Sequence, residues 1–91
     1  MLSGKEKRNF RAQANQLNPE VHVGKEGISA GVVNNLSNAF HTKELVKVKL
    51  LEKCPEDIQD VSEKLVKAVG CEQIQKIGRT LVFYKELEEK E

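Results

Sequence analysis

The stretch VGKEGIS, Val23–Ser29, joins an apolar strand to an amphipathic helix and decides how this chain folds. The residues EVHV, 20–23, alternate polar and apolar side chains and predict a short half-buried strand. Gly24 and Gly27 bracket a lysine and a glutamate, and Ser29 is a suitable N-cap for the helix that follows. Such a loop serves either as a tight turn or as a place where the backbone approaches a negatively charged ligand. The buried face predicted for the helix consists of Ile28, Val32, Leu36, Ala39 and Phe40.

The segments after this helix continue the alternation of strand and helix. Residues 44–51, ELVKVKLL, predict a half-buried strand whose outer face carries Lys47 and Lys49. A third helix is predicted to begin at Pro55, beside acidic residues that favour a helix N-terminus, and to end at Gly70. The segments QIQKI, 73–77, and TLVFY, 80–84, are predicted strands joined by a tight Gly78-Arg79 turn. The core face predicted for the third helix consists of Ile58, Val61, Leu65, Ala68 and Val69.

A basic amphipathic helix is predicted at the start of the chain. Ser3 and Glu6 fit a capping box, and the helix is predicted to end at Asn18-Pro19, because the residue before proline avoids helical dihedrals. Its apolar stripe consists of Phe10, Ala14 and Leu17, and its cationic arc of Lys5, Lys7, Arg8 and Arg11. Such an arc is compatible with plain solubility as well as with a polyanion-binding surface.

The element order predicts an α/β two-layer sandwich, α-β-α-β-α-β-β, with a mixed four-stranded sheet. The strand–helix–strand units favour parallel neighbouring strands, and the final hairpin adds an antiparallel strand. TLVFY is apolar at consecutive positions, so we expect both of its faces to be covered, with the N-terminal helix as a candidate for the second cover. We expect one domain over residues 1–85 and a charged tail over residues 86–91.

The composition favours a small reduced protein of the cytoplasm. Cys54 and Cys71 lie far apart and form no CxxC pair, and the charged N-terminus lacks the apolar stretch of a signal peptide. No apolar run is long enough to span a membrane. The net charge is only +1, but residues 1–51 carry eight Lys or Arg against four acids, whereas residues 52–91 carry seven against ten. The first half is therefore the better candidate for meeting a polyanion, and we expect a monomer.

Catalytic and metal-binding motifs are not evident. His22 and His41 have no recognisable nucleophilic partner, and Asp57 and Asp60 are expected on the exposed side of the third helix. The cysteines and histidines lack ligand spacing, and we expect no cofactor. GKEG is neither a Walker loop nor a dinucleotide-binding fingerprint, but KH domains use a similar GxxG loop to clamp nucleotide backbones.

Three ordered segments, residues 2–29, 44–50 and 77–85, resemble the CRM domain (chloroplast RNA splicing and ribosome maturation), in particular its stand-alone bacterial YhbY-like members. The resemblance implies a fold similar to the C-terminal domain of translation initiation factor three, RNA binding, and association with precursors of the large ribosomal subunit. Lys47 and Lys49 match the family's basic strand, and Glu26 departs from the neutral or small residue expected in the loop. The RNA-contacting residues that it implies are Gly24, Lys25 and Gly27 in the loop and Lys5, Lys7, Arg8 and Arg11 on the first helix.

The sequence therefore favours a cytoplasmic RNA-binding module that acts on ribosomal RNA without enzymatic activity. Two alternatives remain: a protein-interaction module that reaches the ribosome through its acidic half, and a small enzyme with an unrecognised site. A salt-dependent affinity for RNA separates the RNA-binding module from the protein-interaction module.

Overall fold

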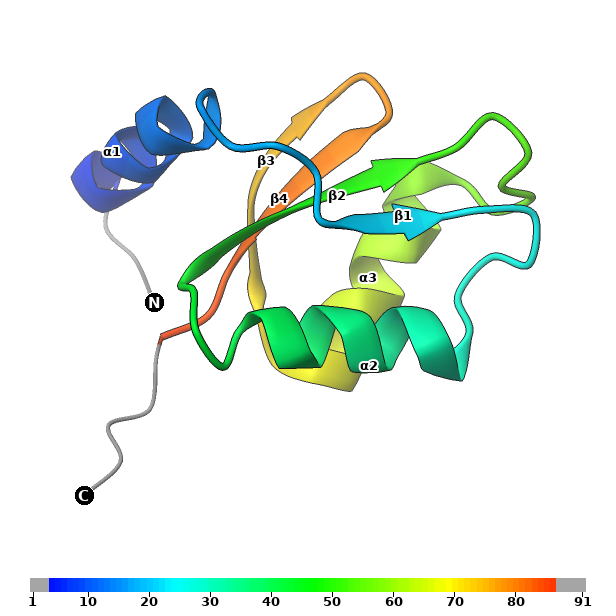
Figure 1. Ribbon diagram of the computed structural model, residues 1–91. Helices are drawn as coiled ribbons and strands as arrows, with labels where there is room; N and C mark the ends of the chain where they lie inside the picture. Colours follow the sequence, from blue (N-terminus) through cyan, green and yellow to red (C-terminus); the bar gives the residue numbers. More distant parts are fainter. Residues whose placement is uncertain (1–3, 87–91) are drawn as a thin grey trace.

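The computed structural model describes residues 4–86 and confirms the predicted mixed α/β fold (Figure 1). Helices α2 and α3 cover one face of a four-stranded sheet, and the basic helix α1 lies at one end of the sheet. None of the described helices is long and apolar enough to cross a membrane. In chain order the elements are α1 (Gly4–Ala14), β1 (Val21–Val23), α2 (Ala30–Ala39), β2 (Leu45–Leu50), α3 (Ile58–Val69), β3 (Glu72–Ile77) and β4 (Thr80–Tyr84).

The strands are ordered β1-β2-β4-β3 across the sheet. Strands β1 and β2 are parallel neighbours, as predicted for a strand–helix–strand unit. Strands β2 and β3 also run in the same direction, but the expectation that they are neighbours is wrong, because β4 lies between them and is antiparallel to both. The two-residue turn Gly78-Arg79, with Gly78 at φ 57°, places β4 directly beside β3. A central position suits β4 because its side chains are buried on both faces of the sheet.

Two separate hydrophobic clusters account for this burial. The larger cluster lies between the sheet and helices α2 and α3, and Leu81 and Phe83 of β4 belong to it. The smaller cluster lies under α1 on the opposite face and consists of Ala14, Leu45, Ile74 and Val82, with Phe10, Leu17 and Tyr84 packed against it. The rings of Phe10 and Tyr84 lie 4.7 Å apart between centroids. Both faces of β4 are thus covered as predicted, and α1, the candidate for the second cover, lies on the face opposite α2 and α3.

The helix ends differ from the predicted ones. Helix α1 ends at Ala14 instead of Asn18, because the amides of Gln16 and Leu17 bond three residues back and the chain tightens into turns. Helix α3 begins at Ile58 instead of Pro55, which leaves residues 55–57 in the preceding loop. The predicted cap residue Ser3 lies outside the described residues.

The buried face of α3 differs from the predicted one at two positions. Ala68 is exposed, whereas Ser62 is only 3% exposed and its hydroxyl contacts the Gln73 side-chain oxygen. At 3.6 residues per turn Ser62 lies nearer the middle of the apolar stripe than Ala68 does. Gly70 ends the helix in the left-handed conformation, at φ 77°, as predicted.

Candidate nucleic-acid interface

The GKEG loop is a tight turn whose two central side chains point into solvent. The Gly27 amide donates to the Gly24 carbonyl at 2.9 Å, and Lys25 and Glu26 are both exposed. Gly27 has φ 66°, a left-handed conformation that side chains rarely adopt. Gly24 has no such requirement, since a Cβ there would only make an ordinary 3.7 Å contact with Leu51. The two glycines of the predicted site therefore have different structural roles.

The Glu56 carboxylate, from the loop between β2 and α3, binds the backbone directly after the GKEG loop. The Ile28 amide donates to Glu56 Oε2 at 2.7 Å, and the other Glu56 oxygen pairs with the Lys64 ammonium. The hydrogen bond from Lys64, followed by the one from Ile28, lowers the pKa of the Glu56 carboxyl. Ser29 caps α2 as predicted, accepting from the Val32 amide at 3.3 Å. Sequence reasoning missed the Glu56 contact because it placed this residue in the first turn of α3.

The two lysines of β2 have different environments. Lys47 is half-buried beneath the end of α1, where its Nζ donates to the carbonyl oxygens of Ala14 and Leu17, each at 3.3 Å. An ammonium at this place satisfies carbonyls that the end of a helix leaves unpaired. Lys49 is exposed. Both lysines lie on the outer face of the strand as predicted, but α1 covers Lys47 and leaves Lys49 exposed.

Lys49 belongs to a row of four residues that crosses the sheet. On the face opposite α2 and α3, His22 pairs in register with Lys49, Lys49 with Thr80, and Thr80 with Ile77. His22 is exposed, and Ile77 is 50% exposed although it is apolar. We refer to these residues as the outer row. The alternation EVHV placed His22 outward, but its position beside Lys49 follows only from the strand register.

The basic side chains of α1 divide into two pairs. Lys7 pairs with Glu72 of β3 at 3.8 Å, and the Arg11 Nε donates to the Ile74 carbonyl at 3.3 Å, so both contact the β3 edge. Lys5 and Arg8 are exposed. Figure 1 shows α1 and the GKEG loop at opposite ends of the sheet. The nine predicted residues therefore form an elongated set rather than one compact patch.

Arg79 at the hairpin turn is held against the end of β2. Its Nε donates to the Leu50 carbonyl at 3.3 Å, and its Nη2 to the Leu51 carbonyl at 2.7 Å. These bonds fix the turn next to the β2–α3 loop. The Arg79 guanidinium therefore has a structural role.

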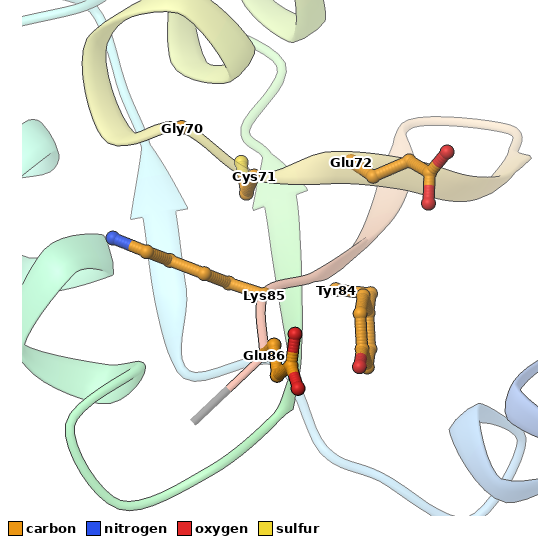
Figure 2. A pocket seen from close by; sticks show the side chains of 6 residues that line it. All are labelled: Gly70, Cys71, Glu72, Tyr84, Lys85 and Glu86. Atoms are coloured by element: carbon orange, nitrogen blue, oxygen red, sulfur yellow. The ribbon is translucent and has the colours of Figure 1, made fainter. Parts of the chain in front are cut away.

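A hollow of about 350 Å³ lies at the C-terminal end of α3, and one of its lining residues, Glu72, pairs with Lys7 of α1 (Figure 2). Its lining includes the acidic side chains of Glu72 and Glu86, and the Lys85 Nζ donates to the Val69 carbonyl at 3.0 Å. Burial raises the pKa of the Cys71 thiol to about 11, so this lining thiol is protonated near neutral pH. The lining residues do not form a nucleophile with an adjacent base. They are Gly70, Cys71, Glu72, Tyr84, Lys85 and Glu86.

Together these features define a small α/β domain with a glycine loop at one end of its sheet, a basic helix at the other, and an exposed lysine, Lys49, on the face opposite α2 and α3. The family model of the CRS1 / YhbY (CRM) domain matches residues 2–85, and the chain belongs to this family. The probable RNA-binding protein YqeI of Bacillus subtilis (strain 168) is 43% identical over 89 residues, covering 98% of this chain and 93% of that protein.

Two further similarities support the same assignment. An RNA-binding protein of Haemophilus influenzae (strain ATCC 51907 / DSM 11121 / KW20 / Rd) is 36% identical over 88 residues, covering 97% of this chain and 89% of that protein. The solution structure of a hypothetical protein from Staphylococcus aureus superposes with a TM-score of 0.81 at 33% identity, covering 100% of this chain and 95% of that one. The predicted resemblance to the CRM domain is thus confirmed over nearly the whole chain.

Proposed function

We propose that the protein binds RNA through an elongated basic surface that follows the outer face of the sheet from α1 to the GKEG loop. The exposed cations of this surface include Lys5, Arg8, Lys25 and Lys49, and His22 lies beside Lys49. Membership of the CRM family and the names of two relatives as RNA-binding proteins support this proposal. The observation that carries it is the exposure of Lys49 and His22 side by side on the open face of the sheet.

The remaining candidate residues support this surface indirectly. Lys7, Arg11 and Lys47 contact protein groups and contribute their charge to the field around it. Gly24 and Gly27 shape the turn that presents Lys25. The ammonium and guanidinium groups would contact phosphates, which fix register and orientation without reading sequence.

The shape of the surface favours structured RNA over unpaired bases. Phe40 and Phe83 are buried, and Phe10 and Tyr84 pack against each other under α1. Stacking on unpaired bases requires exposed aromatic rings, so we propose recognition by backbone and shape. Ribosomal RNA in precursors of the large subunit is the proposed target, in line with the ribosome-maturation role of the CRM family. The protein would act there as a cytoplasmic monomer, without a cofactor and without catalysis.

A salt series with filter binding tests this function. The protein should bind a structured ribosomal RNA fragment with about three to five phosphate contacts, which gives a log–log slope of affinity against salt of about −2 to −4. Sedimentation of a lysate should place the protein with large-subunit precursors more than with mature ribosomes. If the protein sediments with these particles but does not bind RNA at low salt, a protein-mediated contact replaces the RNA proposal.

A further inference from the structure

We infer that Glu56 is a positioning residue: its carboxylate occupies the Ile28 amide and holds the GKEG loop in place. RNA is therefore bound at this loop by the Lys25 side chain and not by the Ile28 amide. This inference rests on the proposed RNA binding. It concerns how the loop makes its contact, and it assigns a function to an acidic residue outside the basic surface.

The contacts of Glu56 are those of a bound anion. One carboxylate oxygen accepts from the Ile28 amide at 2.7 Å, and the other pairs with the Lys64 ammonium. Both bonds are charge-assisted, and the lowered pKa keeps the carboxyl ionised at neutral pH. The side chain of Glu56 is only 21% exposed, compared with 58% for Lys64. The carboxylate thus takes the position that a phosphate oxygen would need in order to accept from this amide.

The loop is built around this carboxylate. A Cβ on Gly27 would collide with Glu56 Oε2, so the absence of a side chain at Gly27 leaves the space in which the carboxylate lies. A phosphate directed at the Ile28 amide would meet the negative charge of Glu56 there. Two exposed acidic residues add to this charge: Glu26, two positions before Ile28, and Asp57, next to Glu56 in the sequence. A tight approach of RNA backbone to this amide is therefore disfavoured, although glycines flank the loop.

The hydrogen bond from the Ile28 amide to Glu56 favours RNA binding by Lys25. Glu56 ties the β1–α2 loop to the β2–α3 loop and so restricts a turn that contains two glycines. A contact from an ordered loop loses less conformational freedom on binding than one from a mobile loop. Holding the turn therefore strengthens the Lys25 contact, even though Glu56 itself carries the wrong charge for RNA.

Variants at two adjacent acidic positions separate positioning from charge. Glu56→Ala removes the acceptor of the Ile28 amide, whereas Glu56→Gln keeps a side-chain oxygen that can accept from it. Asp57→Ala is the control: it removes the same charge from an exposed residue that makes no side-chain capping bond. Filter binding at one salt concentration, well below each melting temperature, should show Glu56→Ala binding about 2- to 5-fold more weakly than Asp57→Ala. Glu56→Gln should bind like the parent.

A double-mutant cycle shows whether Glu56 acts through Lys25. Lys25→Ala should weaken binding in the parent protein but add nothing in the Glu56→Ala background. An additive effect would overturn the inference, and so would Glu56→Ala binding as tightly as Asp57→Ala or more tightly. If the parent protein itself binds no RNA, the proposed function fails before this inference is reached.

The Ile28 amide gives a direct readout that a merely structural role would not move. In ¹H–¹⁵N spectra the Ile28 resonance should keep its position when the ribosomal RNA fragment is added, whereas the Lys25 resonance should shift. A large shift of Ile28 on binding, with a smaller shift in Glu56→Gln, would show that phosphate displaces the carboxylate and would overturn the inference.

Discussion

The Nζ of Lys47 on β2 donates to the carbonyl oxygen of Ala14, the last residue of α1, at 3.3 Å. The same ammonium reaches the Leu17 carbonyl beyond the helix. A cation at this end also interacts favourably with the helix dipole. Lys47 therefore attaches the basic helix to the sheet, while Lys49, two residues along the same face, is exposed.

Lys47→Met and Lys49→Met form a matched pair that separates docking of α1 from RNA binding. We expect Lys47→Met to lower the free energy of unfolding by about 1 kcal/mol, because the helix-end carbonyls lose their donor. Lys49→Met should leave stability within about 0.5 kcal/mol and reduce the salt slope of RNA affinity by about 1. Urea unfolding and filter binding measure the two effects. The reverse pattern would show that Lys47 is the RNA contact.

The tip of the GKEG loop supplies the second prediction. Lys25→Ala should weaken RNA binding by up to about 1 kcal/mol, and Glu26→Lys should strengthen it, because a repulsive charge becomes attractive. Both side chains are exposed, so melting followed by circular dichroism should show unchanged stability. Lys67→Ala serves as the control, since it removes an exposed lysine from α3, on the other side of the sheet. If Lys25→Ala and Glu26→Lys both bind like the parent, the loop is only a turn.

The elements of this fold were predictable from the sequence because its side chains follow the periods of helix and strand. TLVFY indicated a strand covered on both faces, and the structure places Val82 under α1 and Phe83 against α2 and α3. The position of β4 between β2 and β3 was not predictable. Periodicity defines which face of a strand is buried but does not define its neighbours.

The candidate site shows the same limit at the level of single side chains. Lys47 and Lys49 are identical in the alternating pattern, and only the position of α1 makes one a partner of Ala14 and leaves the other exposed. The Glu56–Ile28 contact joins residues 28 positions apart, so no local motif indicates it. The exposed residues of the basic surface stay predictions that the binding experiments will test.

Burial of Cys71 leads to a prediction about alkaline pH. Cys71 is 7% exposed, and the folded-state pKa of its thiol, about 11, lies above the ordinary value of 9.0. Between pH 9 and pH 11 the thiol therefore stays protonated in the native protein but ionises in the unfolded chain. Its contribution to the free energy of unfolding is complete below pH 9 and is lost as the pH rises toward 11. Between these limits the parent should lose on the order of 2 kcal/mol relative to Cys71→Ala. Urea unfolding at pH 8 and pH 10.5 measures this difference, and parallel losses in both proteins would contradict it.

Gly27 and Gly70 allow the contact with Glu56 to be measured separately from backbone strain. Both glycines are left-handed, at φ 66° and 77°, so alanine should cost roughly 1 kcal/mol at either position. A Cβ at Gly70 meets nothing within 4 Å, whereas one at Gly27 displaces the Glu56 carboxylate from the Ile28 amide. Gly27→Ala should therefore cost about 1 to 2 kcal/mol more than Gly70→Ala in urea unfolding.

The same pair of substitutions in the Glu56→Ala background completes this test. Without the carboxylate, a Cβ at Gly27 has nothing to displace, and both glycine variants should lose the same free energy of unfolding. The difference between the two backgrounds then equals the coupling between Gly27 and Glu56. An excess cost at Gly27 that persists without Glu56 would mean that backbone strain alone requires this glycine and that the carboxylate is not what the loop is built around.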